Sequence, residues 1–273
     1  MKIVGIFMIK NEDIYIEQAI LNVVDFCDVI YLEDNESTDG TPAILERLAD
    51  KFSHIHVRTI SDTKQSNEHL VQYFDTDTWV FAVDGDELYD PQGLKKLRMR
   101  LEAGDFNDWW MIYGNCFHIV QFDKETHTAK GYLSPPSKSM TKLYNFSLIS
   151  DFPITDERLH GHPVFKHGSQ DATSRKLDLA SRHSWENAYF RCSHMAFVNR
   201  TSLPKSEKRV FGLRLNPPQI YTLKKTWRER GVLYALPRIV KLVFQLLTGR
   251  DGRTLHYRQG PQETIRIKEF LSR

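Results

Sequence analysis

One stretch of the chain, WVFAVDGDELYD over residues 79–90, joins an apolar segment to a dense group of acids. Residues 79–83 are continuously apolar, which predicts a buried strand, because a parallel sheet is covered on both faces. Four acidic residues follow within seven positions: Asp84, Asp86, Glu87 and Asp90. Like charges this close repel one another. The stretch therefore predicts a strand that ends at a site where a partner balances the charge.

Apolar segments of strand length alternate with helical patterns around this stretch. Strands are predicted over residues 2–9, 29–32, 54–60, 79–83, 109–117 and 140–149. Helices are predicted over residues 11–26 with Asn11 as cap, 42–52, 67–74, 91–102 with Asp90 as cap, and 219–247. This order predicts an α/β fold with a mostly parallel central sheet and flanking helices. Ligands bind at the carboxyl ends of strands in such sheets, which puts the acids at the binding edge.

Charge is distributed unevenly along the 273 residues. Residues 205–273 hold 16 Lys and Arg against 5 Asp and Glu, a net charge of +11, whereas the rest has a net charge of −9. We expect a main domain over 1–204 and a basic helical extension over 205–273. Three scattered cysteines argue against a disulfide framework. The first residues predict a core strand and no secretory leader, so we expect a cytoplasmic protein.

Two acidic groups carry the predicted chemistry. Asp84 and Asp86 flank Gly85, and in extended chain the two carboxylates share a face. Hard oxygen donors of this kind suit Mg²⁺ or Mn²⁺ bridging a diphosphate, whereas the alternative is an ordinary surface turn. Asp34, at the end of the second predicted strand, could accept from a base N–H or a ribose hydroxyl. The fingerprints of dinucleotide-binding proteins, P-loop nucleotidases and serine hydrolases are missing from the sequence.

The three segments FMIKNE (7–12), VIYLEDNESTDGT (29–41) and DGDE (84–87) resemble family-two glycosyltransferases of the GT-A fold, in their bacterial Lys-Asn-Glu branch. The resemblance covers about residues 1–120. It implies that residues 1–204 form a catalytic domain, with a nucleotide-binding half over about 1–120 and an acceptor half over about 121–204. It implies an inverting transfer of a sugar from a nucleoside-diphosphate donor, with Asp34 at the base or ribose. It implies that Asp84 faces ribose or metal and that Asp86 binds the divalent ion. Lys10, Asn11, Glu12 and Gly85 would border the nucleotide.

The same resemblance implies a general base in a loop beyond the fifth strand, where this chain has Ile154-Thr155-Asp156-Glu157. The order of the acids differs from the family pattern, which leaves open whether Asp156 or Glu157 is the base. We prefer Asp156, and Asp151 is a third choice. His194 and His162 match histidines that contact metal or diphosphate in the family. His194 is predicted as a metal ligand, although a lone histidine is more often structural.

The expected acceptor is a glycan or lipid-linked molecule, in lipopolysaccharide or other surface-glycan synthesis. Residues 227–253 are basic and amphipathic but interrupted by Pro237, Arg238 and Lys241, so they predict a segment that lies on an anionic membrane surface. A helix that closes the core is the alternative. Nucleic acid is not expected as a partner. Two rival functions are a metal-dependent sugar nucleotidyltransferase, which the glycine-free segment after the first strand argues against, and a non-catalytic nucleotide-sugar-binding domain.

Overall fold

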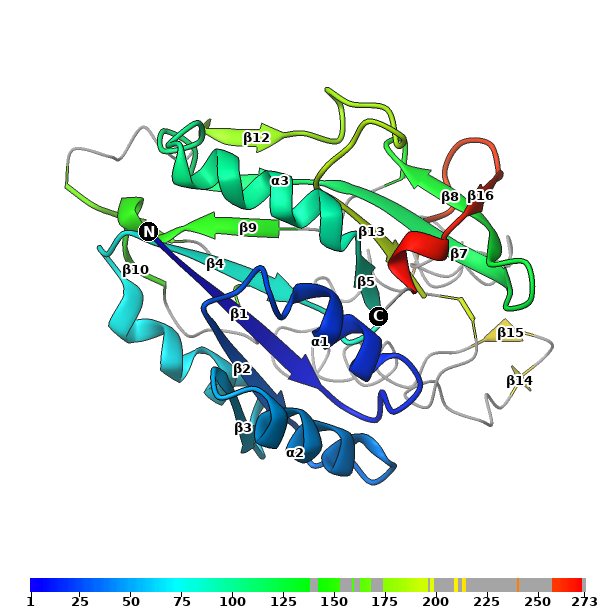
Figure 1. The fold of residues 1–273 in the computed structure, drawn as a ribbon, viewed down its shortest axis with the longest axis horizontal. Coiled ribbons are helices and arrows are strands. Elements are labelled where there is room, and N and C mark those ends of the chain that lie inside the picture. The colour runs from blue at the N-terminus through cyan, green and yellow to red at the C-terminus, as the bar shows by residue number, and fades with distance from the viewer. Residues whose placement is uncertain are drawn as a thin grey trace. The chain divides into compact units, whose positions relative to one another are not determined.

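The structure, a computed structural model, describes residues 1–137, 142–152, 159, 163–167, 174–195, 197–198, 209–210, 213–214, 240 and 257–271 (Figure 1). The chain forms two compact units, one of residues 1–202 with 260–273 and one of residues 203–259. In the second unit, β14 (Arg209–Val210) and β15 (Leu213–Arg214) pair as an antiparallel hairpin. The division at residue 204 stays a prediction. Residues 260–273, which that division assigned to the extension, lie in the first unit.

A seven-stranded sheet forms the centre of the first unit. Its strands, in spatial order, are β12 (Lys176–Asp178), β6 (Met111–Tyr113), β9 (Lys142–Asn145), β4 (Thr78–Val83), β1 (Lys2–Ile9), β2 (Val29–Asp34) and β3 (Ile55–Thr59). β9 runs antiparallel to both β4 and β6, and the other neighbouring pairs are parallel. The mixed α/β fold with a mostly parallel central sheet is therefore confirmed.

Helices cover both faces of this sheet. Three α-helices pack on one face: α1 (Ile16–Val23), α2 (Thr41–Lys51) and α3 (Pro91–Glu102). The 3₁₀ segments η1 (Thr63–Tyr73) and η2 (Phe146–Leu148) pack on the other. Alternate residues of β4 enter the two cores, with Trp79 and Phe81 on the α-helical side and Val80 on the other. The buried strands lack polar alternation because both of their faces are covered.

The predicted caps have different outcomes. Asp90 caps α3 as predicted, since its Oδ1 accepts from the backbone N–H groups of Gln92 and Gly93 at 3.0 and 3.1 Å. The prediction that Asn11 caps the first helix is wrong, because α1 begins only at Ile16. Asn11 instead has a φ of 55°. Its side chain accepts from the backbone of the loop after β2, so it serves a contact between loops.

A second, five-stranded sheet stands beside the first. Its order is β16 (Glu263–Arg266), β8 (Thr128–Ser134), β7 (Asn115–Asp123), β13 (Arg191–His194) and β5 (Glu87–Tyr89). β13 lies between β5 and β7, antiparallel to the first and parallel to the second. The C-terminal segment joins the sheet through β16 and adds the short helix η4 (Lys268–Phe270), in which Phe270 is fully buried.

Two predicted strands are wrong in extent. The strand predicted over 109–117 is divided between β6 in the first sheet and β7 in the second. Gly114 lies at the division, where a Cβ would stand 2.3 Å from the carbonyl oxygen of Phe190, so only glycine fits. In its described part the strand predicted over 140–149 is interrupted, because β9 ends at Asn145, η2 follows, and another strand begins at Ile149. The short helix predicted over 67–74 is part of the 3₁₀ segment η1, and the helix predicted over 219–247 lies outside the described residues, apart from Val240.

Two short strands complete the first unit, where β10 (Ile149–Asp151) pairs antiparallel with β11 (Val164–Phe165). Among the residues that the structure describes, we find no helix with the length and apolar character needed to cross a membrane.

Candidate functional site

The acidic turn after β4 connects the two sheets. Asp84 is half-buried, whereas Asp86 and Glu87 are 3% and 1% exposed. The N–H of Glu87 donates to the carbonyl oxygen of Asp84 at 3.0 Å, and the N–H of Met195 donates to that of Asp86 at 2.9 Å. The turn is therefore fixed by its own backbone and by the end of β13.

Gly85 lets this turn approach the first strand–helix connection. A Cβ at Gly85 would stand 3.1 Å from Cδ1 of Ile16 and 3.2 Å from Cγ of Glu12, closer than side chains usually pack. A larger residue at this position requires Ile16 or Glu12 to shift by a few tenths of an ångström. This close packing explains why a glycine is favoured at position 85.

Glu87 supports the turn from within the protein. Its Oε2 accepts from the hydroxyl of Tyr89 at 2.7 Å and from the N–H of Asp84 at 3.3 Å, while its Oε1 is buried without a hydrogen-bond partner. Burial raises the pKa of Glu87 to about 7, and the nearby charge of Asp84 adds to this rise. The carboxyl group is thus partly protonated near neutral pH, which reduces the repulsion among the acids.

His194 reaches the acids from β13, where it lies opposite Glu87. Its Nε2 is 3.3 Å from Oδ2 of Asp86, and the side chain is almost fully buried. Burial alone would lower the pKa of His194, but the charges of Asp86, Glu87 and Asp84 raise it above its ordinary value. The predicted ligand His194 and the predicted ligand Asp86 therefore meet, although 108 positions separate them in the sequence.

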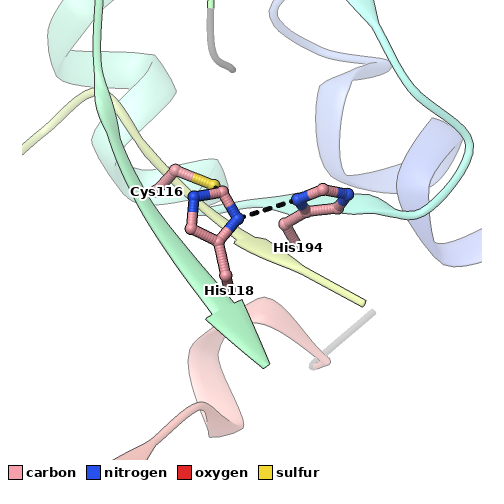
Figure 2. Close-up of side chains that lie close together, drawn as sticks. All are labelled: Cys116, His118 and His194. Carbon is pink, nitrogen blue, oxygen red and sulfur yellow. Dashed lines mark hydrogen bonds between the residues drawn. The ribbon is translucent and has the colours of Figure 1, made fainter. Parts of the chain in front are cut away.

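Two residues of β7, Cys116 and His118, extend this cluster and were not predicted (Figure 2). Nδ1 of His118 lies 2.9 Å from Nδ1 of His194, and Sγ of Cys116 lies 3.6 Å from Nδ1 of His118. All three side chains are buried. The available signal in the sequence was a shared Cys-x-His spacing, which occurs at Cys116–His118 and again at Cys192–His194.

A second part of the edge is the loop after β1, which is bound to the loop after β2. The N–H groups of Asn11 and Glu12 donate to the hydroxyls of Ser37 and Thr41, both at 2.9 Å. Oδ1 of Asn11 accepts from the N–H of Thr38 at 2.8 Å. The segment predicted to border a nucleotide is thus held by side chain–backbone bonds at a defined position.

Asp34 and Lys10 lie on this part of the edge. Asp34 is buried, and both of its carboxylate oxygens lie 3.3 Å from the N–H of Ser37. Lys10 is exposed, and its Nζ donates to the carbonyl oxygen of Asn35 at 2.6 Å. Because β1 lies between β2 and β4, the carboxyl edge presents Asp34, Lys10 and Asp84 in that spatial order.

The neighbouring acid Glu33 has a structural partner. Its Oε2 accepts from Nε of Arg58 at 2.8 Å, and its Oε1 lies 3.3 Å from Nε2 of His69. It points to the opposite side of β2 from Asp34, because successive residues of a strand alternate. Asp156, Glu157 and His162 lie outside the described residues, so their predicted roles are untested.

The donor set of the turn fits a hard divalent cation. Asp84 and Asp86 offer carboxylate oxygens, which Mg²⁺ and Mn²⁺ prefer. The buried acids Asp86 and Glu87, with one oxygen of Glu87 unpaired, form an environment that a cation would stabilise. His194 offers an imidazole beside them.

Comparisons with known proteins place the chain in a family. The family model described as "Glycosyl transferase family 2" matches residues 6–205. An uncharacterized glycosyltransferase of Rickettsia conorii is 22% identical over 267 residues, which cover 88% of each chain. A second relative, an uncharacterized glycosyltransferase of Rickettsia felis, is 23% identical over 83% of this chain and 78% of its own.

Two solved structures are also similar. S. aureus TarS, residues 1–349 in complex with UDP, is 18% identical with a TM-score of 0.40, and the match covers 71% of this chain and 60% of that one. A mannosyltransferase from Pyrobaculum calidifontis in complex with GDP-Man and Mn²⁺ is 12% identical with a TM-score of 0.42, over 99% of this chain and 67% of that one. The family match spans most of the chain and confirms the expected family-two glycosyltransferase, whereas its Lys-Asn-Glu branch stays a prediction. The protein belongs to glycosyl transferase family 2.

Proposed function

We propose that the protein transfers a sugar from a nucleoside-diphosphate donor to an acceptor hydroxyl, with inversion at the sugar carbon and with Mn²⁺ or Mg²⁺ at the turn after β4. The observation that carries this proposal is the order of charged side chains on the carboxyl edge of the first sheet, which is Asp34, Lys10 and Asp84. Asp86, in the same turn as Asp84, is buried. A nucleoside offers hydrogen-bond donors to Asp34, a diphosphate offers negative charge to Lys10, and a divalent cation offers positive charge to Asp84 and Asp86.

The acids along this edge have different proposed roles. Asp34 accepts a hydrogen bond from the base or the ribose, while Lys10, Asn11, Glu12 and Gly85 border the nucleotide. Asp84 and Asp86 are the carboxylate ligands, and the bound ion would neutralise charge on the leaving diphosphate. His194 is the third side chain of this site through Nε2, either as a further ligand or as the donor that orients Asp86.

An inverting transfer also needs a general base on the face opposite the leaving group. We assign this role to Asp156, with Glu157 as the alternative, and neither belongs to the described residues. The base takes the proton of the acceptor hydroxyl as its oxygen attacks the sugar carbon. Parallel Asp156→Asn and Glu157→Gln variants should separate the two, since only the base should lose turnover while keeping donor affinity.

The donor site is tested by calorimetric titration with a panel of nucleoside diphosphates in the presence and absence of Mn²⁺. We expect one diphosphate to bind tightly only with Mn²⁺. Asp86→Asn should weaken this binding by more than about 100-fold, because a metal ligand contributes several kcal/mol to a charged site. Asp50→Asn, which changes an exposed acid of α2, is the matched control. Metal-independent binding, or full binding by the Asp86→Asn variant, would contradict the proposal.

The acceptor and location are proposed from the sequence. The acceptor is a glycan or a lipid-linked molecule of the cell surface, and residues 227–253 bind the inner face of an anionic membrane. Liposome flotation tests the second part: the full chain should float with anionic vesicles, and a chain lacking residues 227–253 should not. Equal flotation of both chains would exclude this segment as the membrane contact.

A further inference from the structure

The cluster of Cys116, His118 and His194 lies on one buried face of the second sheet (Figure 2). In the parallel pair β7–β13, Cys116 is level with Cys192 and His118 is level with His194. Residues two apart in a strand point to the same side, so both Cys-x-His segments present their side chains to one face. Sγ of Cys192 donates to Sγ of Cys116 at 3.6 Å, on the side of Cys116 toward the neighbouring strand.

The spacing of the three ligand atoms matches a tetrahedral zinc site. Zn–S bonds of about 2.3 Å and Zn–N bonds of about 2.0–2.1 Å separate S from N by about 3.6 Å and two nitrogens by about 3.3 Å. The structure has 3.6 Å between Sγ of Cys116 and Nδ1 of His118, and 2.9 Å between the two Nδ1 atoms. Each of the three side chains offers one ligand atom within 4.8 Å of those of the other two. The two Nδ1 atoms need to separate by a few tenths of an ångström for both to reach one ion.

Asp86 supplies an outer partner for this arrangement. A histidine that binds a metal commonly donates its other ring N–H to a carboxylate, which fixes the tautomer. His194 has this geometry, since Nε2 lies 3.3 Å from Oδ2 of Asp86 while Nδ1 faces His118 and Cys116. With the proton on Nε2, the lone pair of His194 points into the cluster.

The ligand types distinguish this cluster from the acidic turn. A thiolate with two imidazoles selects zinc-like cations, whereas carboxylates select Mg²⁺ and Mn²⁺. We propose that Cys116 Sγ, His118 Nδ1 and His194 Nδ1 bind one Zn²⁺ in a buried site separate from the ion of the acidic turn. Binding releases the thiol proton of Cys116 to solvent.

The zinc site itself does not depend on the proposed sugar transfer, but its consequence does. With Nδ1 on zinc, His194 keeps its proton on Nε2 and donates to Asp86. His194 then orients Asp86, which is a ligand of the divalent cation in the acidic turn, and does not bind that cation itself. Asp86 is then held toward His194 through Oδ2.

The test uses the full chain, purified with a reductant that does not bind metals. After removal of metal by a chelator, we expect one equivalent of Zn²⁺ per chain to bind and to resist exchange with excess Mg²⁺. Co²⁺ in place of Zn²⁺ should give a thiolate-to-metal charge-transfer band and the visible absorption of a tetrahedral ion. The absence of stoichiometric Zn²⁺ binding, or a Co²⁺ complex without the thiolate band, would overturn the proposal.

Variants locate the site. Cys116→Ser and His118→Ala should each lower zinc affinity by more than the roughly 10- to 100-fold that loss of an outer-shell partner costs. Cys27→Ser, at the buried cysteine between α1 and β2, is the matched control and should keep the wild-type affinity. Unchanged affinity in the folded Cys116→Ser variant would exclude this cysteine as a ligand. If a variant fails to fold, the cobalt spectrum of the wild-type protein still shows whether a thiolate binds the metal.

The two ions are then measured independently. Asp84→Asn should abolish Mn²⁺-dependent nucleotide binding and leave the Co²⁺ spectrum unchanged, because Asp84 is no part of the buried cluster. Loss of the cobalt band with intact Mn²⁺-dependent binding would reject only the zinc site. Intact cobalt binding without any nucleotide binding would reject only the proposed donor site.

Discussion

The seven-stranded and five-stranded sheets differ in how far along the chain their neighbours lie. β1 to β4 of the first sheet all come from the first 83 residues and are linked by short crossovers. The second sheet joins segments from Glu87 to Arg266. β1 and β4 of the first sheet bury mainly apolar side chains, and Asp34 lies where β2 ends, whereas the second sheet carries Cys116, His118 and His194 inside. Strands that are close in sequence thus form β1 to β4 of the first sheet, whereas strands that are far apart in sequence pair to form the buried cluster of Cys116, His118 and His194.

The strongest test of this contrast is removal of the C-terminal anchor of the second sheet. Phe270 is fully buried, and its ring stacks on Trp185 with centroids 5.6 Å apart. Phe270→Ala should lower the free energy of unfolding by about 3–5 kcal/mol, as for other buried phenylalanines. Chemical denaturation measures the loss, with Val71→Ala at an exposed position as control. A loss below about 1 kcal/mol would mean that the last residues are not part of the folded unit.

The next test concerns the edge of the first sheet. Asp34→Asn keeps the shape of the side chain but removes the charge that the base or ribose would meet. Because a hydrogen bond to a charged group contributes about 1.5–3 kcal/mol, donor affinity should fall about 10- to 100-fold. Calorimetric titration with the nucleoside diphosphate measures it, and Asp39→Asn in the next loop is the control. Equal losses in both variants would assign Asp34 a structural role alone.

A smaller effect comes from the titration of the buried acid in the second sheet. The pKa of Glu87 is about 7 in the folded protein, against an ordinary value of 4.5, so the folded state holds a proton that the unfolded state has lost. Stability without metal should therefore fall as pH rises from about 4.5 to 7, by on the order of 1–2 kcal/mol. The raised pKa of His194 has the same sign, because protonation of the folded state is lost as pH rises.

Denaturation across this pH range with a chelator present measures the fall in stability. Glu87→Gln should reduce it, since the amide keeps the bond to Tyr89 but does not titrate. The exposed Glu46→Gln variant should behave as the wild type. An unchanged slope in Glu87→Gln would show that other groups cause the dependence.

The smallest expected effect is local to the first sheet. Asp62 caps η1, where its Oδ1 accepts from the N–H of Lys64 and the side chain of Gln65 bonds back to the N–H of Asp62. Asp62→Ala should cost about 0.5–1 kcal/mol of stability, and Asp62→Asn should cost less because asparagine also caps. Thermal unfolding of the two variants checks this order. A larger loss of stability in Asp62→Asn than in Asp62→Ala would show that the cap does not cause the effect.

The sequence by itself determined strands β1 to β4 of the first sheet and the place of the acids at their ends. Apolar runs such as residues 79–83 form strands because they must be covered on both faces, and Asp90 with Pro91 specifies the start of α3 by local hydrogen bonding. Asp34, Asp84 and Asp86 could be predicted because they directly follow such strands. These features depend on contacts between near neighbours, which a sequence pattern records.

Only the tertiary structure decided what surrounds Asp86. The meeting of His118 with His194, and the division of the strand at Gly114, depend on β7, β13 and the chain at Phe190 lying side by side. The spacing of Cys116–His118 and Cys192–His194 is visible in the sequence, but 76 positions separate the two segments. Their register is set by strand pairing across the sheet, and no local propensity encodes it. Distant segments therefore give the turn at Asp84–Asp86 its buried neighbours.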